Sequence, residues 1–227
     1  MYSNYFGEIQ AVAFDIDGTL YNEKKLNCRI FMHVLFHLGF FMKYGKARKI
    51  LRKQQSYNDF EKAQAELMGQ LLHCSPQTAQ EKLNKIVYDG LKKYFKRFSA
   101  YKGSLDFIKK LKEHGVKVAV LSDFPPEQKG DIWGILPYCD VVLGSEKVGA
   151  LKPSPFVFSS LKEQLNVPFE NILYVGNHHK YDVVGSKGAN MKAAWIISNI
   201  KALFGKKSLV ADFTFSKYSQ LENKFFE

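Results

Sequence analysis

Apolar residues follow two different patterns along the chain, and the change between them divides the sequence into segments. Short continuous apolar runs predict strands that are covered on both faces, which is the pattern of a parallel sheet. Segments with helical spacing separate these runs, and this alternation favours an α/β fold with a doubly wound parallel sheet. The predicted strands cover residues 9–14, 116–121, 141–143, 172–175 and 194–197, and the predicted helices cover residues 104–114, 155–165 and 182–188.

Residues 22–99 have a different pattern, with no strand signal and with apolar residues at helical spacing. Ser75 and Pro76 fit the N-cap and the first residue of one helix expected there. Because the first strand should pair with strands that follow this block, we expect a helical domain of residues 22–99 inserted into an α/β core of residues 1–21 and 100–227. The two predicted helical faces are Ile30, Val34, Leu38 and Phe41, and Leu83, Ile86, Val87, Leu91 and Phe95.

The composition indicates a folded globular protein, since 46% of the 227 residues are apolar and 15% are aromatic. The formal net charge of +11 favours anionic ligands. The basic residues are dispersed and no recognition motif accompanies them, so nucleic acid is not an expected partner. The three cysteines lack CxxC spacing, which indicates neither a disulfide framework nor a zinc site.

The sequence shows no signal for secretion or membrane insertion. The N-terminus lacks a basic start followed by an apolar stretch. The longest apolar segment, residues 30–42, contains His33, His37 and Gly39 and falls short of the roughly 20 residues that a membrane-spanning helix needs. We therefore expect a cytoplasmic protein without a membrane partner.

Asp15 and Asp17 follow the first predicted strand directly and are the strongest candidates for chemistry, because ligands of parallel sheets gather at the carboxyl ends of the strands. Alternation along the chain points both carboxylates to the same side, and Gly18 lets the backbone turn closely around a small anion. Two carboxylates would repel that anion without a cation. Oxygen ligands without nearby His or Cys favour magnesium over zinc.

Two later strand ends deliver residues that can bind a phosphoryl group. Ser122 follows the strand at residues 116–121, and its hydroxyl can donate a hydrogen bond to a phosphoryl oxygen. Lys152 precedes Pro153 and the start of a helix, and its ammonium group can neutralise both an ionised Asp15 and a phosphoryl group. The sequence therefore predicts an anion site with its own cation.

The strand at residues 172–175 leads into a fourth polar segment. Asn177 and Asp182 follow it and can complete a magnesium site through their side-chain oxygens. His178 and His179 lie between them, but adjacent histidines point in different directions and the other expected ligands are oxygens. We therefore interpret both histidines as loop residues.

These motifs together resemble a known family. The sequence DIDGT at residues 15–19 is similar to the first motif of the haloacid dehalogenase superfamily, most of whose members are phosphatases. Ser122, Lys152 and the pair Asn177 and Asp182 follow in the order of the other three motifs. The resemblance extends from the first strand to the C-terminus and implies a Rossmann-like core, in which the helical block takes the place of the family's cap domain.

The resemblance also implies a role for each residue. In the family, the residue matching Asp15 attacks phosphorus to form an aspartyl-phosphate, and the residue matching Asp17 protonates the leaving oxygen and then activates water. Ser122 and Lys152 would bind the transferring phosphoryl group, with magnesium held by the Asp15 carboxylate, the Asp17 carbonyl and the fourth motif. The residues expected at the substrate are Gly18, Thr19, Ser122, Asp123 and Lys152, and those expected at the metal are Asp15, Asp17, Asn177 and Asp182.

The sequence thus predicts a magnesium-dependent phosphatase for a small phosphorylated metabolite, such as a sugar phosphate, phosphoglycolate or nucleotide monophosphate. Asp17 argues against dehalogenation, because haloacid dehalogenases proper lack this second aspartate. Asn177 departs from the family, which usually has an acid there; its amide brings one less negative charge, so weaker metal affinity is expected. Asp123 either compensates in part or is a turn residue. The alternative is a catalytically weak or inactive phosphate-binding protein with a regulatory role.

The helical block is expected to close over the site because of its insertion point. A basic cluster in this block either attracts a phosphorylated molecule or, as is more common, forms a solvated helical face. The cluster consists of Lys43, Lys46, Arg48, Lys49, Arg52 and Lys53.

Overall fold

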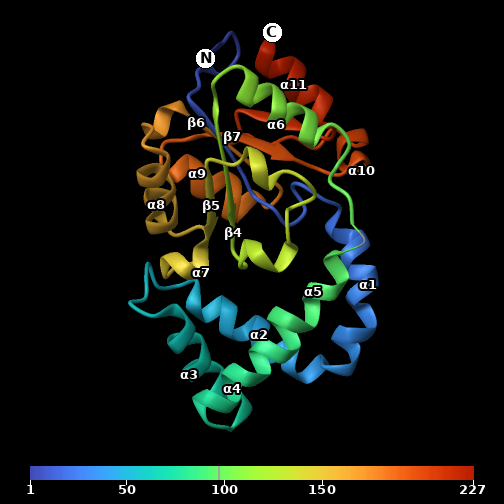
Figure 1. Ribbon diagram of the computed structural model, residues 1–227, viewed down its shortest axis with the longest axis vertical. Coiled ribbons are helices and arrows are strands. Elements are labelled where there is room, and N and C mark those ends of the chain that lie inside the picture. Colours follow the sequence, from blue (N-terminus) through green and yellow to red (C-terminus); the bar gives the residue numbers. More distant parts are fainter. Residues whose placement is uncertain (97) are drawn as a thin grey trace.

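A six-stranded parallel sheet forms the centre of the structure (Figure 1), a computed structural model that describes residues 1–96 and 98–227. The strand order is β5-β4-β3-β6-β7-β8, so β3 lies between β4 and β6. A short antiparallel pair, β1 and β2, precedes the sheet. The strands are β1 Tyr2–Ser3, β2 Gly7–Glu8, β3 Ala11–Phe14, β4 Lys117–Ser122, β5 Val141–Gly144, β6 Ile172–Gly176, β7 Lys192–Ile196 and β8 Phe213–Phe215.

Helices cover both faces of the sheet, which confirms the predicted α/β class. Along β3, Val12 and Phe14 pack against α6 (Ser104–Glu113) and α11 (Tyr218–Phe226). Ala11 and Ala13 point the other way and share a second core with α8 (Pro155–Leu165). Every residue of β3 is buried, as the continuous apolar run predicts. This part of the chain also contains the short helices α7 Ser145–Val148, α9 Gly185–Gly188 and α10 Asn199–Leu203, and a π-helix at His179–Val184.

The inserted residues form a helical block beyond the end of the sheet where β4 finishes (Figure 1). Ser75 caps α4 by accepting a hydrogen bond from the Thr78 amide, and Pro76 is the first helical residue, as predicted. The division of the chain into a core and a cap domain stays a prediction. The block consists of α1 Glu23–Phe36, α2 Leu38–Leu51, α3 Phe60–Leu72, α4 Pro76–Leu83, a π-helix at Asn84–Tyr88 and α5 Asp89–Phe95.

One predicted helical face is wrong. The first helix ends at His37, whose backbone leaves the helical region at φ −116° and ψ 27°, and α2 starts in a new register. Leu38 is therefore 50% exposed, although it was expected to share a buried face with Ile30. The buried face of α2 consists instead of Phe40, Tyr44, Ala47 and Leu51, together with Arg48. The other predicted face is correct: Leu83, Ile86, Val87 and Phe95 are buried and Leu91 packs against them.

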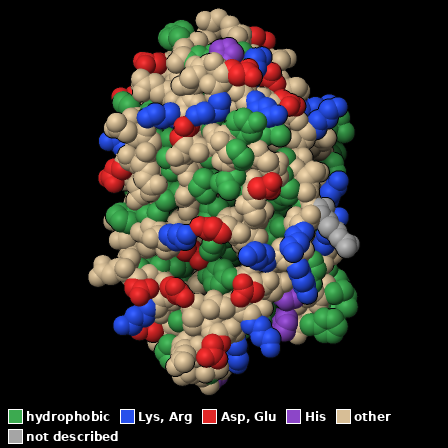
Figure 2. Space-filling view, viewed as in Figure 1, with side chains coloured by type: hydrophobic (Ala, Val, Ile, Leu, Met, Phe, Trp, Pro, Cys, Tyr) green, Lys and Arg blue, Asp and Glu red, His purple; other side chains and the backbone are tan. Residues whose placement is uncertain are grey.

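Charged side chains of both signs are mixed over one face of the molecule. Figure 2 shows Lys and Arg side chains spread over the face in view and interspersed with Asp and Glu. Within the described residues, no helix is long and apolar enough to cross a membrane.

Candidate active site

The predicted site residues meet where three neighbouring strands end. Phe14 of β3 lies opposite Val120 of β4 and Val175 of β6. Because the strands are parallel and in this register, the residues that follow them emerge at the same edge of the sheet. The structure therefore brings together the four sequence motifs.

Asp15 is a buried carboxylate with a partner on each oxygen. Its Oδ1 accepts a hydrogen bond from Lys152 Nζ at 2.7 Å, and its Oδ2 accepts one from Thr19 Oγ1 at 3.0 Å. Burial raises the pKa of Asp15 to about 8, because desolvation outweighs the attraction of Lys152, and the charges of Asp182 and Asp17 add to the increase.

Lys152 links the two acidic motifs. Its Nζ lies 2.7 Å from Asp15 Oδ1 and 2.6 Å from Asp182 Oδ1, and it also donates to the Tyr174 hydroxyl at 3.1 Å. Burial alone would lower the pKa of Lys152, but Asp15 and Asp182 raise it well above its usual value. The other oxygen of Asp182 accepts the His178 amide at 2.8 Å, so both oxygens of this carboxylate are engaged. Asp182 therefore orients Lys152 in this structure.

Asp17 is more accessible than Asp15, whose side chain is 7% exposed. The Asp17 side chain is 24% exposed, and its Oδ1 accepts a hydrogen bond from the Tyr21 hydroxyl at 2.7 Å. Its Oδ2 accepts one from Ser122 Oγ at 3.2 Å and lies 3.2 Å from Lys129 Nζ. This environment of donors can hold a carboxylate while leaving it access to a reacting oxygen. Sequence reasoning missed Lys129, which belongs to no recognisable motif.

Gly18 and Asn177 pack closely between the motifs. Gly18 has φ +82°, and a Cβ at this position would lie 2.0 Å from Asn177 Nδ2, so only glycine fits without rearrangement. Asn177 Nδ2 donates to Glu23 Oε2 at 3.4 Å. Burial and the neighbouring Asp17 raise the pKa of Glu23, which sequence reasoning also missed. Glu23 thus places an additional carboxylate beside the position where the family usually has an acid.

The donor set fits a hard cation. Of the four expected ligands, Asp182 has both oxygens engaged by Lys152 and the His178 amide, so it acts here as a partner of Lys152. The Asp15 carboxylate, the Asp17 backbone carbonyl and the Asn177 amide oxygen are hard oxygen donors. The described residues contain no group of three or more His, Cys, Asp or Glu side chains that could hold a metal. The expected metal site contains only one side chain of these types, because its other two ligands are a backbone carbonyl and an amide.

The two histidines of the fourth motif make contacts outside this donor set. The His178 ring stacks on Tyr181 with centroids 4.0 Å apart. His179 Nε2 lies 2.8 Å from Ser208 Oγ. Neither histidine belongs to the expected metal donor set, but the interpretation as loop residues is wrong for His179, which begins a π-helix at His179–Val184 with His178 as its N-cap.

Asp123 and the basic cluster connect the helical block to the site. Arg52 of α2 pairs with Asp123 Oδ2 at 2.5 Å, and Asp123 Oδ1 accepts hydrogen bonds from Ser145 Oγ at 2.8 Å and the Lys152 amide at 3.0 Å. Burial would raise the pKa of Asp123, but Lys152, Arg52 and Arg48 lower it below its usual value. Asp123 is thus held as an anion that fixes the Lys152 segment.

Arg48 makes a second connection and is buried, unlike most of the basic cluster. It pairs with Glu146 of α7 and donates to the Asp123 carbonyl at 3.1 Å and to Gln64 Oε1 at 3.2 Å. The expectation of a solvated helical face is therefore wrong for Arg48 and Arg52, while Lys46 and Lys49 are exposed.

The sequence profile described as haloacid dehalogenase-like hydrolase matches residues 12–196. The chain belongs to this family. The predicted resemblance is therefore confirmed, and the matched segment includes all four motifs of the site.

Curated relatives of this haloacid dehalogenase-like chain include two proteins named pyrophosphatase PpaX. The one from Bacillus mycoides is 24% identical over 219 residues, covering 94% of this chain and 95% of the relative. The one from Halalkalibacterium halodurans is 27% identical over 190 residues, covering 82% and 83%.

Solved structures of other family members share the fold. A phosphatase from Thermococcus onnurineus matches with a TM-score of 0.61 and 24% identity, covering 95% of this chain and 97% of that one. The L-2-haloacid dehalogenase from Xanthobacter autotrophicus matches with a TM-score of 0.64 and 18% identity, covering 95% and 97%. At these identities the structures establish the fold of this chain and not its substrate.

Proposed function

We propose that this protein is a magnesium-dependent phosphatase that hydrolyses a small phosphorylated metabolite through an aspartyl-phosphate on Asp15. The observation that carries the proposal is the placement of Asp15 between Lys152 and Thr19, with a second acid, Asp17, at the same strand end. The family and the pyrophosphatase relatives indicate a phosphate-ester hydrolase. Inorganic pyrophosphate therefore joins the sugar phosphates, phosphoglycolate and nucleotide monophosphates as a candidate substrate.

Asp15 and Asp17 would divide the chemistry between them. The Asp15 carboxylate attacks phosphorus while the bond to the leaving oxygen breaks, and Asp17 donates its proton to that oxygen. Asp17 then takes a proton from water, which attacks the aspartyl-phosphate and releases phosphate. Tyr21 and Ser122 donate hydrogen bonds to Asp17 and hold its carboxylate in place for both transfers.

The cations around Asp15 would reduce the repulsion between two anions. Lys152 holds one Asp15 oxygen, and it lies where it can also contact the phosphoryl group. When bound, magnesium would supply positive charge to the same carboxylate and to the phosphoryl oxygens. Asp182 and Tyr174 keep the Lys152 ammonium in position.

The alternative is a protein that binds phosphate without hydrolysing it. It is based on Asn177, which stands where the family usually has an acid. The proposal for an enzyme is favoured because the nucleophile, the second acid, the hydroxyl and the lysine are assembled at one edge of the sheet. Glu23, beside Asn177, also returns negative charge to that part of the site.

Phosphate release from a panel of phosphomonoesters and pyrophosphate tests the proposal directly. We expect hydrolysis by the wild-type protein with magnesium and little without it, and a loss of at least about 1,000-fold in Asp15→Asn. A wild-type protein that is inert toward the whole panel but binds phosphate would favour the binding protein. Equal activity in the wild type and Asp15→Asn would refute the assignment of the nucleophile.

A further inference from the structure

Lys129 is a buried cation for which the proposed mechanism has no role. It ends the short 3-10 helix Pro126–Lys129, which follows β4 and Ser122. Its side chain is 0% exposed, and within the described part of the chain its Nζ has no hydrogen-bond partner. The nearest opposite charge is Asp17 Oδ2 at 3.2 Å. The ammonium group of Lys129 has three N–H donors, and these lie beside the proposed acid, Asp17, without a hydrogen-bond acceptor among the described residues.

The fold stabilises this charge only in part. Removing an ammonium group from water is costly unless it is paired and hydrogen-bonded. The Asp17 carboxylate offsets some of this cost, and the rings of Phe95 and Phe124, with centroids 5.4 and 5.3 Å from Nζ, contribute cation–π attraction. A methionine of similar length would avoid the cost altogether. Retaining the ammonium group indicates that it has another anion to bind.

The position of Lys129 indicates where that anion lies. Asp17 must contact the leaving oxygen to protonate it, and Lys129 lies next to the same carboxylate oxygen. Lys152 instead pairs with Asp15, the proposed acceptor of the phosphoryl group. Through these partners, Lys152 is associated with the acceptor of the phosphoryl group and Lys129 with the acid that contacts the leaving group.

We propose that Lys129 binds a negative charge on the leaving group, so that the preferred substrates carry a second anionic group close to the scissile oxygen. This inference rests on the proposed phosphatase function. The second group is a phosphate or a carboxylate, because either oxygen anion accepts the free ammonium donors. During the reaction the leaving oxygen takes its proton from Asp17, and Lys129 holds the departing anion.

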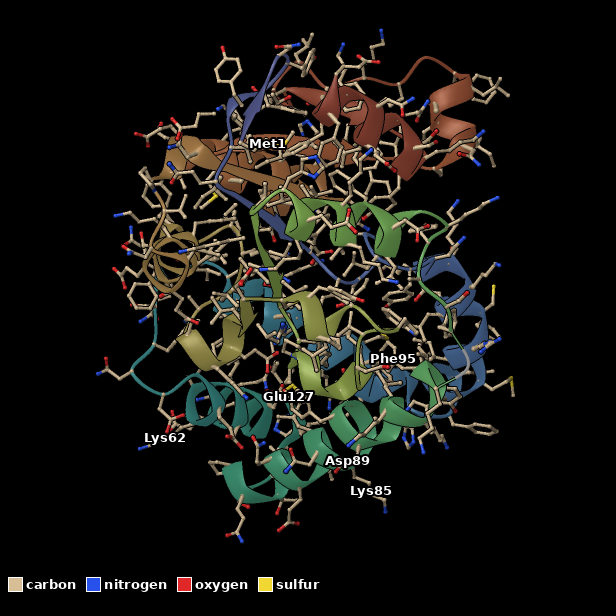
Figure 3. The ribbon with its side chains drawn as sticks, turned by 45° about the horizontal axis from the view of Figure 1, so that its top comes forward. Met1, Lys62, Lys85, Asp89, Phe95 and Glu127 are labelled. Atoms are coloured by element: carbon tan, nitrogen blue, oxygen red, sulfur yellow. The ribbon has the colours of Figure 1, made fainter. Side chains whose placement is uncertain are left out.

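The helical block completes this subsite. Gln128 Nε2 donates to the carbonyl oxygens of Val87 and Tyr88 at 2.8 Å each, which fixes the turn that carries Lys129 against the block. Phe95, at the end of α5, packs over the ammonium group. Figure 3 labels Phe95 and Glu127, which lie at this border between the block and the sheet. The anion would thus bind in a place from which the block excludes water, which strengthens its attraction to Lys129.

The test compares Lys129→Met with the wild type and with Lys147→Met, a control lysine near the same turn whose side chain is 65% exposed. The substrates are pyrophosphate, phosphoglycolate and phenyl phosphate, whose leaving groups carry a phosphate, a carboxylate and no charge. We expect Lys129→Met to reduce the preference in kcat/KM for an anionic over the neutral leaving group by about 10- to 100-fold. The control should keep the wild-type preference.

Further measurements separate a structural effect from the proposed one. Lys129→Gln, which keeps a donor toward Asp17 without the charge, should lose the same preference if Lys129→Met fails to fold. Titration calorimetry with methylenediphosphonate and methylphosphonate gives a readout without turnover, and the wild type should favour methylenediphosphonate while Lys129→Gln should not.

The outcomes distinguish this inference from the proposed function. Equal losses on all three substrates, with unchanged phosphonate selectivity, would overturn the role of Lys129 and leave the phosphatase intact. A wild-type protein that releases phosphate neither from these three substrates nor from the wider phosphomonoester panel would overturn the proposed function. The phosphonate titrations alone would then test whether Lys129 binds a second anion. The pyrophosphate and phosphoglycolate arms show whether the second anion is a phosphate or a carboxylate.

Discussion

Replacing Arg48 should destabilise the protein far more than replacing a neighbouring lysine on the same helix. The side chains of Arg48 and Glu146 are 8% and 10% exposed, so this ion pair is shielded from water. In Arg48→Met, Glu146 keeps only the hydrogen bond from the Tyr88 hydroxyl at 2.8 Å among its described partners, and the Asp123 carbonyl loses a donor. Removing one partner of a buried pair costs about 3–5 kcal/mol, because the other charge stays buried.

Urea denaturation measures this cost and shows whether it comes from the Arg48–Glu146 pair. The variants are Arg48→Met, Glu146→Gln, the two changes combined, and Lys49→Met. Arg48→Met should lower the free energy of unfolding by about 3–5 kcal/mol, and Arg48→Met combined with Glu146→Gln should lower it by less than the sum of the single changes. Lys49→Met is the matched control because Lys49 is the exposed neighbour, and it should stay within about 0.5 kcal/mol of the wild type.

A small effect of Arg48→Met would refute the reasoning. If its free energy of unfolding stays within about 0.5 kcal/mol of the wild type, Arg48 is solvated in solution and the helical block is not held to the sheet through this pair. Additive single changes would show instead that Arg48 and Glu146 do not interact.

Three further predictions concern the site itself. Asn177→Asp should tighten magnesium binding, measured by calorimetry, because it restores an anionic ligand; an unchanged affinity would show that position 177 is not a ligand. Gly18→Ala should remove most activity and destabilise the fold by at least about 1 kcal/mol, because φ is +82° and the new methyl group would meet Asn177; normal activity would contradict this geometry. Asp15→Asn should be more stable than the wild type in metal-free buffer at about pH 9 but not at about pH 4. The sign follows because folding raises the pKa of Asp15 from 3.8 to about 8, so the stability that its protonated form provides is lost as pH rises to that value. Equal pH profiles of unfolding would refute it.

The core of the fold and the motif residues could be predicted because each signal is local. One continuous apolar run ends directly before Asp15 and another ends at Ser122. Because the two strands pair in parallel, their carboxyl ends lie next to each other regardless of the sequence that connects them. Lys152 is different, because it lies beyond α7 and not at a strand end, and its place near Asp15 was predicted from its motif. The helix at residues 104–113 likewise follows from its own spacing.

Lys129 and Glu23 could not be predicted, because their roles depend on contacts that no local pattern encodes. Lys129 is one of many lysines, and its burial results from Phe95, which a separate helix delivers from the inserted block. Glu23 reads as an ordinary first-turn acid of α1, and it meets Asn177 only through the packing of Gly18. Both residues lie where separate parts of the chain meet.

The basic cluster illustrates the same limit on a single helix. Helical spacing shows which residues share a face but not which face meets the sheet, so Arg48 and Lys49 could not be distinguished. The error at Leu38 has a related cause, because the break at His37 shifts the register and apolar spacing alone does not reveal it.

The central claim is that Asp15 becomes phosphorylated, and acid-quench labelling tests it most directly. The protein is mixed with radiolabelled pyrophosphate and magnesium, quenched in acid within the first turnover, and digested for peptide mapping. We predict label on the peptide that contains Asp15 in the wild type and none in Asp15→Asn. Phosphate release by the wild type without label on that peptide would contradict the account.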